Sequence, residues 1–312
     1  MLSVIIPSRN MPSWPFLQKT IDSIFENAVG DIEVIVILDG YTPDPFLKEN
    51  SKLTIIQRNK VHGMRRGVND AVAMAKGEYI MKCDDHCMFS PRFDEVLKKD
   101  IEPNWLVVPV RYTLTDEWII KRHYTCYEYA AYPYKNSLCI GLYAKKWYGE
   151  HGDDPTNSGF NQYYFRERQL KHIPIDEIMI IQGSCWFTTK QHFINIEGLF
   201  DYESMYQEPQ ELSLKTWLSG GKVMVNKNAW YGHMYKSDKP RAKGHHRGYE
   251  LTVAEMRAIE RYGTWYWMND QWPLATRKIK WFVEHFWPIP GWPENWEEEK
   301  IKFEEKYNVC YL

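Results

Sequence analysis

The feature that most constrains the fold is a series of short apolar runs, each ending in polar residues. The run 32–38 is almost wholly apolar, as is typical of a strand buried on both faces of a parallel sheet. In order, the chain first predicts strand 2–7, helix 15–27, strands 32–38 and 53–57, helix 67–76 and strand 78–83. This order indicates an open α/β sheet, in which ligands bind beyond the carboxyl ends of the strands.

The rest of the chain is less regular. A strand is predicted at 104–110, and residues 111–176 then show no clear periodicity, which is typical of a functional or mobile insertion. Order returns with 178–188, helices 190–196 and 211–218, strands 222–225 and 229–233, and a helix at 251–262. Residues 237–248 are basic and predict a flexible segment, and an acidic helix is predicted in the tail.

Composition excludes some classes of protein. The net charge of −2 excludes a chain that is basic overall, such as a nucleic-acid clamp, but not a local basic groove. Cys83 and Cys185 lie within apolar runs, which predicts reduced, buried thiols. Because we see no signal sequence and no apolar run long enough for a membrane span, we expect a cytoplasmic protein. Many of the 14 Trp follow residue 264, which suggests a stacking surface besides core packing.

The sharpest local signal is the tripeptide Asp84-Asp85-His86 at the end of a predicted strand. In extended backbone, residues i and i+2 project to the same side, so Asp84 and His86 can reach one ion while Asp85 points away. A carboxylate and an imidazole suit Mn²⁺ or a similar divalent cation, and diphosphate oxygens could fill the remaining positions. The alternative is an ordinary polar turn.

Other polar residues at strand ends and helix starts extend this hypothesis. Asp39 follows a central strand and could accept hydrogen bonds from a nucleobase or ribose, or simply cap a turn. Arg65 and Arg66 open a helix and could neutralise a diphosphate, unless they are a solvated pair. His233 follows a short strand and could supply a third metal ligand, although a lone His is more often structural.

Taken together, several segments carry a family resemblance. They are Gly63-Met64-Arg65-Arg66, Asp84-x-His86-Cys87, the strand 182–187, Glu208-Pro209-Gln210-Glu211-Leu212-Ser213, Trp217-Leu218-Ser219-Gly220-Gly221 and Gly232-His233-Met234-Tyr235-Lys236. This ordered series resembles the GT-A nucleotide-sugar glycosyltransferases of the broad family 2 type, in particular the polypeptide N-acetylgalactosaminyltransferases. The resemblance covers roughly residues 3–100 and 178–262 and implies a GT-A fold, an open mixed sheet flanked by helices.

The resemblance also implies roles for individual residues. Asp84, His86 and His233 would hold Mn²⁺ (or Mg²⁺), and the donor would be a UDP-sugar. The residues expected to bind that donor are Pro7, Ser8, Arg9, Asp39, Arg65, Arg66, Asp85, Gly183, Trp186 and Lys236. The expected catalytic residues are Glu208, Asp84 and Glu211. Trp186 would line the sugar pocket or, alternatively, pack between strand and helix.

One departure from the wider group bears on the mechanism. Inverting members usually carry an Asp base at the position where this chain has Pro209, which cannot accept a proton. We therefore expect a retaining transfer, in which the leaving diphosphate accepts the acceptor's proton and Glu208 binds the sugar or acceptor. The alternatives for Glu208 are stabilisation of the first helical turn and a role as an inverting base.

The expected organisation follows from these assignments. Residues 1–262 would form the GT-A catalytic domain and 263–312 an aromatic extension. Within that domain we expect a nucleotide-sugar half at 1–110, an acceptor-side insertion at 111–176, and an acceptor half at 177–262 with a lid at 237–248.

The acceptor is the least constrained part of the hypothesis. One candidate is a 5-hydroxymethylated pyrimidine in DNA, as in phage enzymes that modify their own genome. Basic residues interleaved with aromatic ones would serve it: Arg111, Lys121, Arg122, Lys135, Lys145, Lys146, Arg166, Arg168, Lys171 and the lid. The other candidate is an envelope glycan or small hydroxyl compound. A catalytically inactive sugar-nucleotide or glycan-binding module is a third possibility, and the oligomeric state is open.

Overall fold

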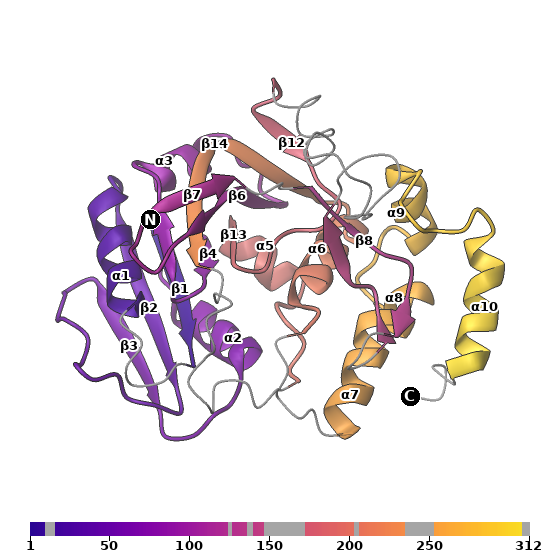
Figure 1. Cartoon of the computed structure of the whole chain (residues 1–312), viewed down its shortest axis with the longest axis horizontal. Coiled ribbons are helices and arrows are strands. Elements are labelled where there is room, and N and C mark those ends of the chain that lie inside the picture. Colours follow the sequence, from indigo (N-terminus) through magenta and orange to yellow (C-terminus); the bar gives the residue numbers. More distant parts are fainter. Residues whose placement is uncertain are drawn as a thin grey trace.

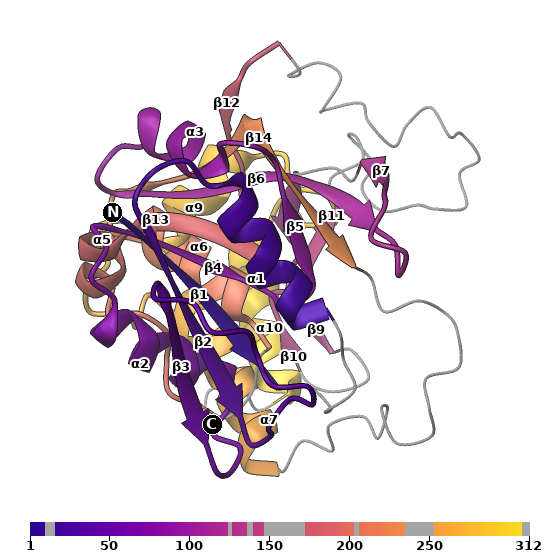
Figure 2. The same ribbon diagram turned by 90° about the vertical axis from the view of Figure 1, so that its left-hand side faces the viewer.

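The computed structural model of the chain describes residues 1–9, 16–123, 127–135, 140–146, 172–202, 206–234 and 253–307. These residues form a large β-sheet with helices packed against it (Figures 1 and 2). The first elements are β1 (Leu2–Ser8), α1 (Phe16–Asn27), β2 (Ile32–Asp39), β3 (Leu53–Arg58), α2 (Met64–Met74) and β4 (Tyr79–Cys83). The predicted β-α-β-β-α-β order is therefore confirmed.

The chain continues through elements that complete the sheet and cover it. They are β5 (Cys87–Phe89), α3 (Phe93–Lys99), β6 (Trp105–Leu114), β7 (Ile120–His123), β8 (Glu128–Ala130), β9 (Tyr134–Lys135), β10 (Ile140–Gly141), β11 (Ala144–Lys146), β12 (Ile175–Glu177), β13 (Cys185–Thr189), α5 (Lys190–Asn195), α6 (Glu208–Leu218) and β14 (Lys222–Met234). The last are α7 (Val253–Glu260), the π-helix η2 (Arg261–Trp265), α8 (Tyr266–Met268), α9 (Ile279–Phe286) and α10 (Trp296–Tyr307).

The strand pairing places several polar termini at one edge. Among the described residues, the ten-stranded sheet has the order β12-β14-β6-β13-β4-β1-β2-β3, with β5 on β14 and β7 on β6. Strand β1 is parallel to both β2 and β4, and β2 is parallel to β3. The carboxyl ends of these strands, marked by Ser8, Asp39 and Cys83, therefore meet at the same edge. Strand β13 runs antiparallel between β4 and β6.

The alternation of side chains along the central strands builds a core on each face of the sheet. Val4 of β1 packs with Leu17 and Ile21 of α1 on one face. Its neighbour Ile5 points the other way and packs in a second cluster with Val68 of α2. All of β2 is buried, as its apolar run predicted. Cys83 and Cys185 are free and buried, as predicted.

Strand β14 differs from the sequence prediction. The polar residues Asn226, Lys227 and Asn228 read as a break between two short strands, but the structure has one strand, Lys222–Met234. Its pairing with β6 shifts between Asn226 and Trp230. Asn226 Oδ1 accepts a hydrogen bond from the Asn228 amide at 3.0 Å, so the extra residues form a bulge and the strand continues.

The aromatic tail belongs to the core. Trp267, Trp272, Trp292 and Trp296 are buried in the cluster that also contains Leu212 of α6. The prediction of a stacking surface is therefore wrong for these four tryptophans, because the tail packs against α6 and needs large apolar side chains there. Helix α9 was not predicted, whereas the acidic helix α10 was. A membrane-crossing helix is not found in the described part of the chain.

We expect protonation of His192 to lower the free energy of unfolding of the protein in mild acid. Its side chain is buried in α5, where Nε2 lies 3.0 Å from Thr216 Oγ1. Burial lowers the pKa of His192 to about 4. In the unfolded chain the imidazole of His192 is protonated below about pH 6.5, whereas in the folded protein it stays neutral until about pH 4. The free energy of unfolding therefore falls by about 3 kcal/mol as the pH is lowered from about 6.5 to about 4.

Urea unfolding of the wild type and of His192→Gln at pH 7 and pH 4.5 measures this contribution. The variant should lose less stability between the two pH values than the wild type. The same loss in both proteins would show that His192 is not responsible.

Candidate metal centre

Three potential metal ligands converge at the carboxyl edge of the sheet. Asp84 and His86 follow β4, and the Asp84 amide donates a hydrogen bond to the Ser184 carbonyl at 2.9 Å. His233 arrives on β14, where the pairing with β5 places it opposite Cys87. The Met234 amide donates to the His86 carbonyl at 3.2 Å, which brings His233 beside this turn.

The geometry of this cluster suits one ion. One potential ligand atom from each of Asp84, His86 and His233 lies within 4.8 Å of the others. His233 Nε2 lies 3.1 Å from Asp84 Oδ2, and the two imidazole rings are 4.7 Å apart between centroids. The structure thus brings together the three residues that the sequence analysis selected, although they come from two distant parts of the chain.

The charge states also fit a divalent cation. Burial lowers the pKa of His233 to about 4 against the opposing effect of Asp84, so the imidazole is neutral at pH 7, as a ligand must be. Burial would raise the pKa of Asp84, but Lys82, His233 and His86 together outweigh burial and lower it below its usual range, so the carboxyl stays ionised. One carboxylate and two imidazoles suit Mn²⁺ and leave coordination positions for ligand oxygens.

Asp85 supports the cluster from behind. As predicted, it points away from the shared ion position: Oδ1 lies 2.7 Å from His86 Nδ1, and Oδ2 accepts a hydrogen bond from Ser8 Oγ at 2.5 Å. Tyr41 also hydrogen-bonds Ser8. A carboxylate on Nδ1 orients the His86 ring and directs Nε2 outward as a ligand. In this structure Ser8 contacts Asp85, and Asp85 contacts His86, whereas donor contacts of Ser8 and Asp85 stay predictions.

Glu208 lies next to this cluster at the start of α6. It is 3% exposed; its Oε1 accepts a hydrogen bond from Trp186 Nε1 at 2.7 Å, and its Oε2 lies 3.6 Å from Lys82 Nζ. Burial raises the pKa of Glu208 although Lys82 and Trp186 oppose this. A Cβ at Gly183 would come within 2.8 Å of Pro209 Cγ, so only glycine lets the segment before β13 approach α6 here. Of the two alternatives for Trp186, the structure shows packing: the ring is fully buried and stacks on Phe193.

Arg65 and Glu211 pair away from the metal ligands. Glu211 Oε2 bonds Arg65 NH1, and its Oε1 lies 2.9 Å from Lys215 Nζ and accepts the Phe200 amide at 2.7 Å. The three charged side chains are almost fully buried. In this structure the Arg65 guanidinium is bonded to Glu211, and a contact between Arg65 and a diphosphate stays a prediction. These contacts make Glu211 a structural link between α2 and α6.

Asp39 organises the loop that leads into α2. Its Oδ1 and Oδ2 accept hydrogen bonds from the amides of His62 and Gly63, each at 2.9 Å, and Oδ1 lies 3.3 Å from Arg58 NH1. Gly63 has a φ of 90°, which other residues rarely adopt. The turn-capping alternative is thus present, and a contact between Asp39 and a nucleoside stays a prediction.

The remaining predicted donor-binding residues are dispersed around this edge. Pro7 lies within β1, whereas Arg9 and Arg66 are exposed beyond a strand end and at the start of α2. The Gly183 carbonyl accepts a hydrogen bond from Lys82 Nζ at 2.6 Å. Lys236 and the predicted lid 237–248 lie outside the described residues. Donor contacts for all of these residues stay predictions.

Lys82 is a site residue that the motifs did not indicate. It is the single cation inside the otherwise uncharged strand β4, Tyr79–Cys83, and stands two residues before Asp84, so both side chains lie on one face. That spacing could have indicated Lys82 as a neighbour of Asp84.

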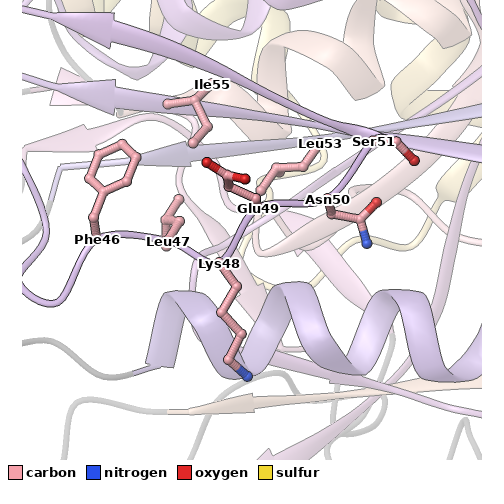
Figure 3. Close-up of a pocket in the computed structure, with 8 residues that line it drawn as sticks. All are labelled: Phe46, Leu47, Lys48, Glu49, Asn50, Ser51, Leu53 and Ile55. Carbon is pink, nitrogen blue, oxygen red and sulfur yellow. The ribbon is translucent and has the colours of Figure 1, made fainter.

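A pocket lies at the opposite end of the parallel strands from the metal ligands, at the start of β3 (Figure 3). Its volume is about 450 Å³, and Phe46, Leu47, Leu53 and neighbouring residues line it.

Comparisons with known sequences identify a family. The model of the family described as glycosyl transferase family 2 matches residues 3–169. Polypeptide N-acetylgalactosaminyltransferase 5 of Caenorhabditis elegans is 23% identical over 333 aligned residues, which cover 93% of this chain and 49% of that protein. The chain spans about half the length of the N-acetylgalactosaminyltransferase relatives that it matches. The sequence-based resemblance is thereby confirmed.

Solved structures share the fold. GalNAc-T7, solved with UDP, GalNAc and Mn²⁺, has a TM-score of 0.61 at 16% identity over 98% of this chain and 55% of that chain. The 1–349 fragment of TarS from S. aureus, solved with UDP-GlcNAc, has a TM-score of 0.53 at 13% identity, over 90% of this chain and 69% of that one. The predicted GT-A class, a mixed sheet flanked by helices, is confirmed.

We expect Asp84→Asn and Asp85→Asn to differ in their effect on metal binding. Asp84→Asn removes the only carboxylate of the cluster and should abolish Mn²⁺ binding. Asp85→Asn only loosens the His86 ring and should weaken binding by about 10- to 100-fold.

Electron paramagnetic resonance of Mn²⁺, with UDP present, measures both affinities, and melting curves confirm that both variants fold. Equal losses would contradict the assignment of Asp84 as ligand and Asp85 as support.

Proposed function

The chain belongs to glycosyl transferase family 2, and from this premise we propose that it transfers a hexose or N-acetylhexosamine from a UDP-sugar to a hydroxyl acceptor, in a reaction that needs a divalent cation. The observation that carries this proposal is the cluster of Asp84, His86 and His233 beside Glu208, at the carboxyl ends of the parallel strands. An intact ligand set argues against an inactive binding module. We assign residues 1–262 to the catalytic unit and 263–312 to a C-terminal extension.

The structural neighbours support the choice of donor. GalNAc-T7 was solved with UDP and Mn²⁺ and TarS with UDP-GlcNAc, and both share this fold. In our proposal Asp84, His86 and His233 hold the cation. When bound, the cation stabilises negative charge on the departing diphosphate, usually a large contribution in such sites. Ser8 and Asp85 keep the His86 ring oriented for this.

Glu208 and Pro209 support a retaining reaction. Pro209 occupies the position of the usual inverting base and has no proton acceptor in its side chain. Glu208 is held at both oxygens, by Trp186 and by Lys82, and is buried, as suits a group that fixes a sugar or acceptor hydroxyl. The leaving diphosphate is then the group that accepts the proton, and the product keeps the α configuration of the donor.

A donor screen tests this proposal. We expect at least one of UDP-glucose, UDP-galactose and their N-acetyl forms to release UDP slowly to water in the presence of Mn²⁺, and Asp84→Asn to abolish release. NMR should show the α anomer as the first free sugar. Release of the β anomer would contradict retention and favour Glu208 as an inverting base, and no release from any donor would contradict the proposed activity.

For the acceptor, the interleaved basic and aromatic residues of the insertion support DNA with 5-hydroxymethylated pyrimidines. Arg111 does not support DNA as the acceptor, because its side chain is buried and donates a hydrogen bond to Glu128 at 3.3 Å. Much of the insertion, including Arg166, Arg168 and Lys171, lies outside the described residues. The other acceptor class is a glycan or small hydroxyl compound.

We expect the enzyme to add sugar to hydroxymethylated duplex DNA and to bind it with an affinity that falls steeply with salt. Mass spectrometry of the digested DNA measures transfer, and unmodified duplex is the control. No transfer and no salt-sensitive binding would leave the glycan class as the acceptor.

A further inference from the structure

Lys82 is a buried cation directly behind the proposed metal site. It lies in β4 between β1 and β13, opposite Ile5 on one side and Trp186 on the other. Only 2% of the residue is exposed, and its side chain lies on the same face of the strand as Asp84. The three metal ligands by themselves do not explain why a lysine stands at this position.

The ammonium group of Lys82 is fully engaged. Its Nζ donates to Asp84 Oδ1 at 2.9 Å and to the Gly183 carbonyl at 2.6 Å, and it lies 3.6 Å from Glu208 Oε2. A lysine ammonium in contact with two carboxyl groups is positively charged at neutral pH. The side chain therefore places a positive charge on the one carboxylate of the ligand set.

Stability does not explain a lysine at this place. Burying two charges costs several kcal/mol, and apolar residues of similar volume often replace a buried ion pair without loss. The effect of Lys82 on the site is more specific. Asp84 supplies the only negative charge among the three ligands, and Lys82 offsets that charge while leaving Oδ2 directed towards His233.

We propose that Lys82 is a resident counter-ion that makes divalent-metal binding at Asp84, His86 and His233 depend on simultaneous binding of a nucleoside diphosphate. The inference rests on the proposed function for the identity of that diphosphate. A cation entering alone shares Asp84 with a buried ammonium and is repelled by it. A cation entering with a diphosphate brings additional negative charge and oxygen ligands, which overcome the repulsion.

Thermodynamic linkage makes this dependence reciprocal. If UDP strengthens Mn²⁺ binding by a given factor, Mn²⁺ strengthens UDP binding by the same factor. Lys82 would raise this factor by weakening the binding of Mn²⁺ alone. Asp85 does not supply the negative charge that Lys82 offsets at Asp84, because the two carboxylate oxygens of Asp85 are directed to His86 and Ser8.

Isothermal titration with Mn²⁺ alone, with UDP alone, and with Mn²⁺ in the presence of UDP tests the proposal. Lys82→Gln removes the charge but keeps a donor for Asp84 or Gly183, and Lys82→Met removes both. We expect both variants to bind Mn²⁺ alone about tenfold or more tightly than the wild type, and to show a smaller enhancement by UDP.

Lys215→Gln is the matched control. Lys215 is equally buried and makes the same kinds of contact, 2.9 Å to Glu211 Oε1 and 2.6 Å to the Gly198 carbonyl, but its carboxylate is not in the metal cluster. Its loss should lower the melting temperature and leave the affinity for Mn²⁺ alone unchanged.

Unchanged or weaker binding of Mn²⁺ alone by Lys82→Gln would overturn the proposal, as would a wild type whose Mn²⁺ affinity rises less than about tenfold with UDP. The second criterion needs no variant and holds if a substituted chain does not fold. If the wild type shows the coupling but turns over no sugar nucleotide, the proposed function fails and this inference stands.

Discussion

The structure depends on pairing of charges that are buried behind the carboxyl edge of the sheet. Lys82 lies in a central strand, where an unpaired charge would cost a large free energy of desolvation. It forms ion pairs with Asp84 on one side and Glu208 on the other. This arrangement connects the proposed metal ligands to the start of α6. The site is therefore held by interior ion pairs as well as by the loops that follow the strands.

A second group of buried charges sets the position of α6 itself. Arg65 on α2 and Lys215 on α6 both pair with Glu211, so that α6 is fixed against α2. The start of α6 then packs on the segment before β13 at Gly183, and Glu208 faces Lys82. The family motif assigns Arg65 to donor binding. In this structure Arg65 also contributes to the site by holding α6, the helix that carries Glu208.

Local pattern was informative where neighbouring residues decide geometry. The spacing of Asp84 and His86 predicted a shared side, and Asp85 was correctly expected to point away. The contact of Asp85 with the His86 ring was not predictable, because it depends on the position of Ser8 at the end of another strand. Lys82 was overlooked since a lysine within an apolar strand has no evident partner until β13 and α6 are in place.

By itself the sequence determined the order of the first strands and helices, up to β4, the family, and which side chains could serve as metal ligands, because periodicity and motif spacing are local properties. Only the tertiary structure decided that His233 meets Asp84, that Trp186 and four of the tail tryptophans are buried, and that Lys82 lies between two carboxyl groups. These outcomes depend on strand pairing and helix docking between distant segments, and no local pattern specifies which buried charges will meet.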